Sequence, residues 1–174
     1  MNKAVFLDRD GTINVDKNYL YKVEDFEFLP DVIESLKKFQ DLGYLLIIIT
    51  NQSGIARNYY TKDDFLKLNK WLINYLSNYS IHISNIYYCP HGPDSICECR
   101  KPKLGLFEQA AKDFDIDLDS SIAIGDKERD VSICKKYGTK GFVLYSKENK
   151  RIENIDFIKG GLIQAAEIIK RDVK

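Results

Sequence analysis

Short apolar segments alternate with segments of helical periodicity along this chain. The second apolar segment, YLLIIIT at 44–50, contains no charged residue. A strand with one face in water alternates apolar and polar side chains, so an unbroken apolar run indicates a strand covered on both faces. We expect further strands at 4–7, 86–88, 121–125 and 141–145, and helices at 31–42, 104–114, 131–137 and 163–169, with a longer helix between the second and third strands.

This alternation predicts a three-layer α/β fold. Its centre would be an open, doubly wound parallel sheet of the Rossmann type, with helices on both faces. The 174 residues suffice for one sizeable core, and no linker or repeat divides them, so we expect 1–174 to form a single domain. In such sheets ligands bind beyond the carboxyl ends of the strands.

Residues that favour helix ends mark several boundaries. Gly43 and Gly138 follow two of the predicted helices, where a glycine commonly ends a helix. Thr61 and Asp64 resemble a capping box and would begin the long helix. The aromatic residues of that helix, Trp71 among them, have the spacing of a packing stripe rather than of a base-stacking surface.

Composition restricts the possible partners. The formal net charge is zero and the isoelectric point is near 6.7, so no overall field attracts nucleic acid or an anionic membrane. The first apolar run meets charge at Asp8, which argues against a signal peptide or a membrane span. We therefore expect a cytoplasmic monomer that acts on a small molecule.

Three polar clusters directly follow three of the predicted strands: DRDGT at 8–12, TNQSG at 50–54 and GDKERD at 125–130. One parallel sheet would bring them to the same edge, with Asp8, Asp10 and Asp126 close together. Carboxylates that converge repel one another unless a cation lies between them. Oxygen ligands with room for phosphate and water suit Mg²⁺.

This arrangement suggests the chemistry of phosphate-ester hydrolysis. Asp8 would attack phosphorus, and an aspartyl-phosphate would divide one hard step into two easier ones. Asp10 would protonate the leaving alkoxide and later activate water, and Gly11 would allow the turn that aims it. The Thr50 hydroxyl would hold phosphoryl oxygens. A lone DxD is more often a solvated turn, and Asp126 and Asp130 alone could cap the following helix. Three such clusters in this order nevertheless favour catalysis.

A second metal site is expected in the loop at 89–99. Three cysteines and one histidine there form a complete tetrahedral zinc shell with no open position, which is typical of a structural site. These ligands are Cys89, His91, Cys97 and Cys99. The alternative is that they are ordinary cysteines. Cys134 is expected in the core and His82 on the surface.

The basic segment RKPK follows the zinc loop at once. Zinc ligation would fix where Arg100 and Lys101 point. Lys101 would balance the charge of Asp8 and of the phosphoryl group, and Lys103 is a weaker candidate for that task.

DRDGT, TN and GDKERD, with a lysine between the last two, resemble the four motifs of the haloacid dehalogenase superfamily of phosphohydrolases, over nearly the whole chain. The resemblance implies that Asp8 is the nucleophile and Asp10 the acid/base, which also gives the metal its backbone carbonyl. It implies that Asp126 is a metal ligand and that Lys101 is the third-motif lysine.

Two branches of that superfamily have a similar zinc loop before RKP. One hydrolyses heptose bisphosphates for surface polysaccharides made from ADP- or GDP-heptose, and the other hydrolyses histidinol phosphate in histidine biosynthesis. The short gap between His91 and Cys97 resembles the histidinol branch. The segments at 13–19, 26–28 and above all 50–57 resemble the heptose branch, which we favour, although Asn58 replaces its usual glycine.

The substrate residues follow from that choice. The segment between Asp8 and Thr50 is too short for a separate cap domain, so short loops must select the substrate. A bisphosphate needs a second anion site, which Arg57 and Arg100 could provide bidentately. Further substrate contacts are expected from Asp16 and Tyr19 on sugar hydroxyls, and from Asn51, Gln52, Ser53 and Lys127.

Two other classes of protein were weighed. A non-catalytic sugar-phosphate binder would not need Asp8, Asp10, Lys101 and Asp126 together. A zinc-ribbon interaction module is disfavoured by the αβ pattern that surrounds one small loop.

Overall fold

The structure, a computed structural model, describes residues 1–172. Within them, six strands form one parallel sheet in the order β3-β2-β1-β4-β5-β6. The strands are β1 (Ala4–Leu7), β2 (Leu45–Asn51), β3 (Ile83–Cys89), β4 (Ile122–Gly125), β5 (Lys140–Val143) and β6 (Ile155–Phe157). The order reverses on either side of β1, which is where such sheets bind ligands.

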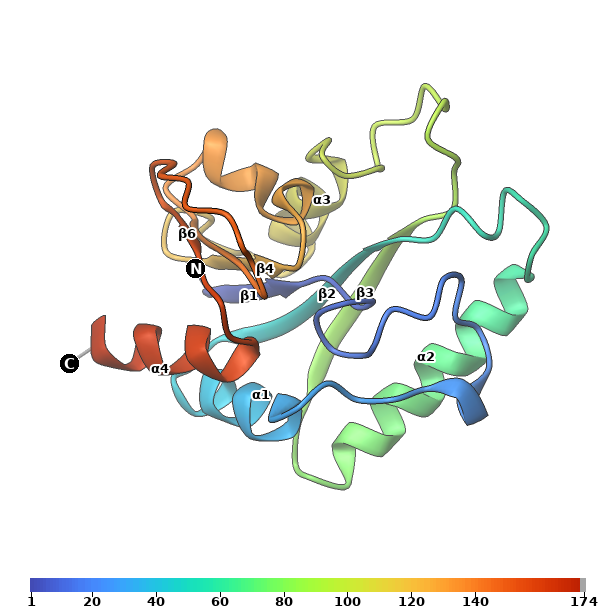
Figure 1. Cartoon of the computed structure of the whole chain (residues 1–174), viewed down its shortest axis with the longest axis horizontal. Coiled ribbons are helices and arrows are strands. Elements are labelled where there is room, and N and C mark those ends of the chain that lie inside the picture. The colour runs from blue at the N-terminus through green and yellow to red at the C-terminus, as the bar shows by residue number, and fades with distance from the viewer. Residues whose placement is uncertain (173–174) are drawn as a thin grey trace.

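Helices cover both faces of this sheet (Figure 1). One face carries α1 (Val32–Asp41), α2 (Lys62–Ser77) and α4 (Leu162–Asp172), and the other carries α3 (Gly105–Asp113) and the 3₁₀ helix η2 (Glu128–Lys135), while the short η1 spans Val23–Asp25. None of the described helices is long and apolar enough to cross a membrane. The predicted three-layer, doubly wound architecture is confirmed.

Two hydrophobic clusters hold the layers together. Val5 and Leu7 of β1 lie in the cluster that includes α1 and α4 side chains, and Ala4 and Phe6 lie in the cluster with α3. Successive side chains of a strand point to opposite faces of the sheet, so a strand that is apolar at every position has buried side chains on both faces. This explains the apolar runs from which the sheet was predicted.

The helix-end predictions for the first half of the chain are confirmed. Gly43 follows α1 in the left-handed conformation, with φ of +84°. Thr61 and Asp64 form the capping box of α2, each accepting from the other's backbone N–H. Trp71 packs edge-on against Phe26, with ring centroids 5.1 Å apart, as a packing stripe requires.

The predictions for the second half need corrections. The helix expected at 131–137 is a 3₁₀ helix that begins at Glu128, because the Asp130 carboxylate accepts a hydrogen bond from the Lys127 N–H and starts it early. It ends at Lys135, so Gly138 is not its cap.

Strand limits also differ from the prediction. The strand expected at 86–88 spans Ile83–Cys89. The strand expected at 141–145 ends at Val143, and Tyr145 has a left-handed φ of +52°. β6 was not predicted, because three residues at the sheet edge carry little periodic signal.

The strand register brings the polar clusters together. Leu7 pairs with Ile48 of β2 on one side and with Ile124 of β4 on the other. The residues that follow these positions therefore leave the sheet side by side. The motifs at 8–12, 50–54 and 125–130 meet at the carboxyl edge, as predicted.

Candidate active site

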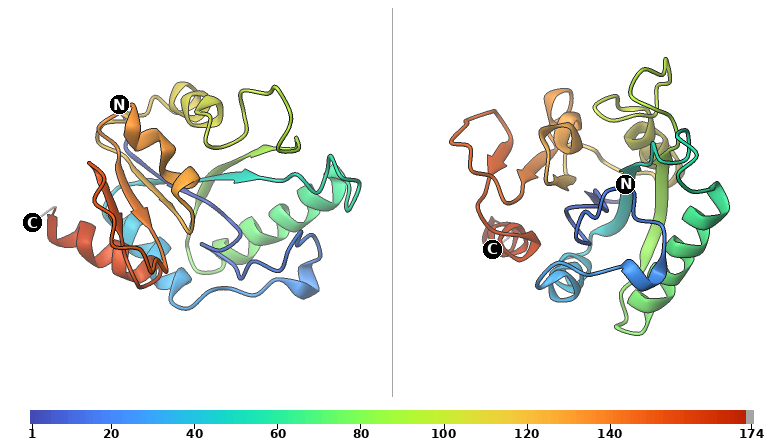
Figure 2. Two further views of the ribbon diagram at one scale, coloured as in Figure 1. Left: turned by 45° about the horizontal axis from the view of Figure 1, so that its top comes forward. Right: turned by 45° about the vertical axis from the view of Figure 1, so that its right-hand side comes forward.

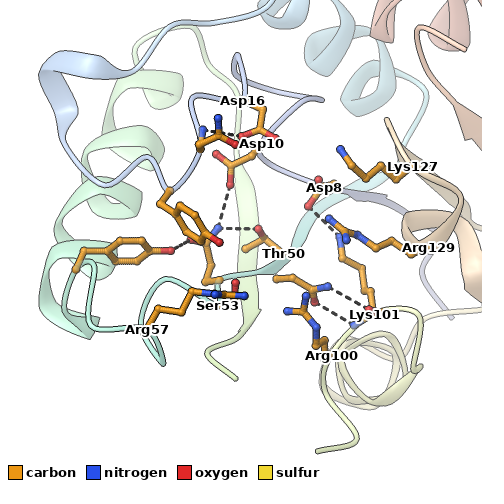
Figure 3. Close-up of a pocket in the computed structure, with 15 residues that line it drawn as sticks. Asp8, Asp10, Asp16, Thr50, Ser53, Arg57, Arg100, Lys101, Lys127 and Arg129 are labelled. Carbon is orange, nitrogen blue, oxygen red and sulfur yellow. Dashed lines mark hydrogen bonds and ion pairs between the residues drawn. The ribbon is translucent and has the colours of Figure 1, made fainter. Parts of the chain in front are cut away.

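A cavity of about 260 Å³ opens at this edge (Figure 3). All residues predicted for catalysis or substrate binding line it: Asp8, Asp10, Asp16, Tyr19, Thr50, Asn51, Gln52, Ser53, Arg57, Arg100, Lys101 and Lys127. The cavity is also lined by Asn18, Tyr60 and Arg129, which sequence reasoning did not select.

A buried lysine joins two carboxylates at the base of the cavity. The ammonium of Lys101 lies 2.9 Å from Asp8 and 2.8 Å from Asp130, and it donates to the Ile49 carbonyl at 2.7 Å. Burial, followed by the charge of Asp130, raises the pKa of Asp8 to about 7, although Lys101 opposes that shift. Burial lowers the pKa of Lys101, but the two carboxylates outweigh it, so the net pKa is raised.

Three carboxylates converge beside that lysine. Oxygens of Asp8, Asp126 and Asp130 all lie within 4.8 Å of one another. Within residues 1–172, the buried Oδ1 of Asp126 has no hydrogen-bond partner. A set of carboxylate oxygens with such an unsatisfied atom fits a hard divalent cation.

Gly11 permits this approach of Asp126. Its φ is +87°, and a Cβ atom at this position would lie 2.5 Å from Asp126 Oδ2. Any larger residue would therefore be strained and would also displace a carboxylate of the cluster.

The Asp10 carboxylate lies outside the group formed by Asp8, Asp126 and Asp130, although Asp10 lines the same cavity as Asp8. The buried Arg9 guanidinium bonds both of its oxygens at 3.1 Å. Asn14 donates to Oδ1 at 2.9 Å and Gln52 donates to Oδ2 at 3.1 Å. The Asp10 side chain is thus held in one orientation, and only its backbone carbonyl remains as the predicted metal ligand.

Asn51 at the end of β2 holds the backbone of Lys101. Its Oδ1 accepts from the Lys101 N–H at 3.0 Å, and its Nδ2 donates to the Lys101 carbonyl at 3.1 Å. This pair connects the second motif directly to the third.

The four predicted zinc ligands lie together. The segment that carries them projects beyond β3 and returns towards α3 (Figure 2). Cys89 Sγ is 3.7 Å from Cys97 Sγ, and His91 Nδ1 is 3.4 Å from Cys89 Sγ and 3.2 Å from Cys99 Sγ. Tetrahedral zinc with ordinary bond lengths places two sulfurs about 3.8 Å apart and a nitrogen and a sulfur about 3.5 Å apart. The donor set therefore fits zinc. Cys134 is buried in the core and His82 is exposed, as expected.

Cations surround the cavity mouth. Within the described chain, the guanidinium groups of Arg57, Arg100 and Arg129 have no carboxylate within 4.0 Å. Lys127 pairs with Asp126 at 2.9 Å. Lys103 turns away to Glu98 in the zinc loop, so it does not compete with Lys101.

Several residues of the site gave no usable sequence signal. Arg9 is fully buried and bonds Asn69 of α2, yet an arginine between two aspartates normally suggests a solvated turn. Asp130 was considered only as a helix cap. Tyr60 lies in the loop before α2, and Arg129 lies in the first turn of η2. Neighbours along the chain do not show that either residue lines the cavity, and only the folded chain reveals these four.

Known proteins are similar to this chain over most of its length. Residues 3–156 match the family described as polynucleotide kinase 3 phosphatase. A D-glycero-beta-D-manno-heptose-1,7-bisphosphate 7-phosphatase from Haemophilus ducreyi is 46% identical over 149 residues, or 82% of each chain. The chain belongs to the haloacid dehalogenase superfamily of phosphatases. A relative of the same name from Helicobacter pylori is 51% identical over 131 residues, covering 75% of this chain and 76% of its own.

Solved structures agree with this membership. The D,D-heptose 1.7-bisphosphate phosphatase from B. bronchiseptica, complexed with magnesium and phosphate, superposes with a TM-score of 0.85 at 25% identity, covering 98% of this chain and 99% of its own. A Had-superfamily hydrolase from Ehrlichia chaffeensis, at 15% identity and a TM-score of 0.64 over 100% of both chains, shares the fold. This chain is thus a phosphatase, that is, a phosphoric monoester hydrolase.

Proposed function

We propose that this phosphatase removes the 7-phosphate of D-glycero-D-manno-heptose 1,7-bisphosphate, in the synthesis of activated heptose for surface polysaccharides. The observation that carries the proposal is its identity of 46% to a curated enzyme of that name, across 82% of both chains. Histidinol phosphate, the alternative substrate suggested by the short zinc loop, is not favoured by these relatives.

Asp8, Asp126 and the backbone carbonyl of Asp10 would hold Mg²⁺, with Asp130 beside them. When bound, the ion neutralises the substrate phosphate and the carboxylates that face it. Lys101 contributes a second positive charge against Asp8. Together they reduce the repulsion between an anionic nucleophile and an anionic phosphate.

The protein side chains then have distinct tasks. Asp8 forms a bond to phosphorus as the bond to the sugar C7 oxygen breaks, and Asp10 delivers a proton to that oxygen. Asp10 next takes a proton from water, which attacks the aspartyl-phosphate and releases inorganic phosphate. Thr50 and Lys101 hold phosphoryl oxygens in both steps.

The remaining cavity residues would select the substrate. Arg57 and Arg100 line the cavity and have no carboxylate partner among the described residues, so their guanidinium groups would hold a second phosphate. Asp16 and Tyr19 would contact sugar hydroxyls from the opposite loop. Further contacts would come from the Ser53 and Lys127 side chains.

The cysteine-histidine cluster would hold a structural zinc ion. Arg100 follows Cys99 directly and donates to the carbonyl of the ligand His91 at 3.3 Å. A closed zinc shell would therefore hold Arg100 towards the cavity and set the entry of Lys101 into the site.

The test is release of inorganic phosphate by the purified protein with Mg²⁺. Three substrates are compared: heptose 1,7-bisphosphate as separate α and β anomers, histidinol phosphate, and a 3′-phosphorylated oligonucleotide as the substrate type in the family description. We expect kcat/KM for one heptose anomer to exceed that for the other two substrates by about a hundredfold or more. Phosphorus NMR of the product must show that the 1-phosphate remains. Comparable rates on histidinol phosphate would refute the assignment.

A further inference from the structure

A chain of buried hydrogen bonds runs from Tyr60 to the predicted acid/base. The Tyr60 hydroxyl donates to Gln52 Oε1. The Gln52 Nε2 group donates to Asp10 Oδ2 at 3.1 Å and to Thr50 Oγ1 at 2.9 Å, and the dashed lines of Figure 3 end on these two residues. Gln52 is 3% exposed and Tyr60 is 5% exposed.

The chemistry of these groups gives the chain a direction. The Asp10 carboxyl oxygens accept hydrogen bonds from Arg9 and Asn14, and the amide nitrogen of Gln52 faces them as a third donor. The amide oxygen then faces Tyr60 and needs a donor. Burial raises the pKa of Tyr60 to about 12, so its hydroxyl stays protonated and supplies that donor.

Both amide hydrogens of Gln52 are used within the protein. The hydrogen given to Thr50 occupies a lone pair of Oγ1, which leaves the threonine O–H free to donate to a phosphoryl oxygen. The hydrogen given to Asp10 restricts rotation of a carboxylate that must reach the leaving oxygen. Gln52 was predicted to bind substrate, but this geometry gives its amide a different task.

The position of Tyr60 is itself fixed by packing. Its ring stacks on Tyr21, with centroids 5.5 Å apart. A Cβ atom at Gly54 would lie 2.2 Å from the Tyr60 ring, so only glycine allows the close approach. Packing against Tyr21 and Gly54 therefore holds the Tyr60 hydroxyl in position to donate to Gln52.

We infer that Tyr60 and Gln52 are positioning residues that orient the Asp10 carboxylate for proton transfer and the Thr50 hydroxyl for phosphate binding. This inference rests on the proposed roles of Asp10 and Thr50 in the phosphatase reaction. Without the Tyr60 hydroxyl, the buried Gln52 oxygen loses its hydrogen-bond donor, and the amide is held only through its contacts with Asp10 and Thr50.

The experiment compares two phosphate esters in Tyr60→Phe. The alkoxide leaving group of heptose 1,7-bisphosphate needs a proton, whereas the nitrophenolate of p-nitrophenyl phosphate does not. Because kcat/KM reports the steps up to loss of the leaving group, a misplaced Asp10 affects only the sugar ester. We expect the loss in kcat/KM for the sugar ester to exceed that for the aryl ester by about tenfold. The loss common to both esters reports the Thr50 hydroxyl.

Controls separate this role from general damage. Tyr59→Phe removes the hydroxyl of the neighbouring, 54% exposed tyrosine and should leave both values of kcat/KM unchanged. Gln52→Met keeps the side-chain length but removes both donors, and should show a larger excess loss on the sugar ester. Equal losses on the two esters in both variants, or no loss, would overturn the inference.

Failure of the proposed substrate gives a different result. In that case the wild-type protein hydrolyses p-nitrophenyl phosphate but not the heptose bisphosphate. The comparison is then made with the alkyl phosphate that the wild type hydrolyses best, since any alkoxide leaving group needs the same proton.

Discussion

Lys101 and Asp8 form an ion pair of 2.9 Å at the base of the cavity, with the ammonium almost completely buried. The same ammonium reaches Asp130 at 2.8 Å. A buried lysine shared between two carboxylates keeps its charge, because removing the proton would leave both anions without a counterion. The ion pair would therefore balance part of the negative charge of the proposed nucleophile, Asp8, when a phosphate approaches it.

Asp8→Asn should abolish turnover, because an amide cannot form the acyl-phosphate bond. The fold should persist, since Lys101 keeps its contact with Asp130. Phosphate release measures activity, circular dichroism measures folding, and metal analysis measures zinc. Beryllofluoride with Mg²⁺ should label Asp8 in the wild type only. A substantial residual rate in Asp8→Asn contradicts the mechanism.

Binding of Mg²⁺ should depend on pH through Asp8. Its pKa is raised to about 7 in the metal-free protein, so below that pH the carboxyl is protonated and must lose its proton to bind the cation. Affinity should rise about tenfold per pH unit up to about pH 7 and then level off. Calorimetry in buffers of different ionisation enthalpy should detect about one proton released per ion near pH 5.5 and almost none near pH 8.5. In Asp8→Asn this release should disappear, and a release that persists there would assign it to another group.

Arg57→Ala should weaken recognition of the second phosphate. We expect kcat/KM for the bisphosphate to fall about tenfold to a hundredfold, mainly through KM, because a free guanidinium is lost from the cavity mouth. Heptose 7-phosphate, which lacks the distal group, should be hydrolysed equally well by the variant and the wild type. Arg57→Lys should retain part of the binding. Unchanged kcat/KM for the bisphosphate would show that Arg57 does not contact it.

Loss of zinc should lower activity without touching the magnesium cluster. Cys97→Ser removes one of the four ligands, so zinc content should fall well below the one ion per chain expected for the wild type. The 89–99 loop should become sensitive to protease, and kcat should fall because Arg100 and Lys101 lose their anchor. Cys134→Ser changes the buried cysteine outside the cluster and should retain the zinc. A fully active, zinc-free Cys97→Ser would separate the loop from catalysis.

Gly11→Ala should weaken Mg²⁺ binding more than it weakens the fold. The added methyl group would meet Asp126 Oδ2 at 2.5 Å, and φ of +87° is unfavourable for alanine. Strain of this kind costs about 1–2 kcal/mol. Denaturant unfolding measures that cost, and calorimetry with Mg²⁺ measures the displacement of Asp126. Gly43→Ala, also at positive φ but with only Lys3 Cε as a neighbour at 3.8 Å, should lose stability without losing Mg²⁺ affinity.

The sequence by itself determined the layered fold and the main polar residues of the site. Apolar strands that end in charged residues can be recognised locally, because burial on both faces requires an unbroken apolar run and parallel strands share one functional edge. This places Asp8, Thr50 and Asp126 at one edge of the sheet. The zinc ligands can also be recognised from the sequence, because all four lie in one short loop and their spacing along the chain is typical of zinc sites.

Only the tertiary structure decided how those residues are oriented. The sequence indicated Asp130 only as a possible helix cap, because its contact with Lys101 depends on packing between η2 and the loop before α3. Asp10 is turned to Arg9 rather than to the carboxylate cluster, since Arg9 and Asn14 of its own loop and the distant Gln52 all donate to it. The sequence does not predict the hydrogen bond between Tyr60 and Gln52 either. Contacts of this kind depend on side-chain direction and burial in three dimensions, and periodicity along the chain contains neither.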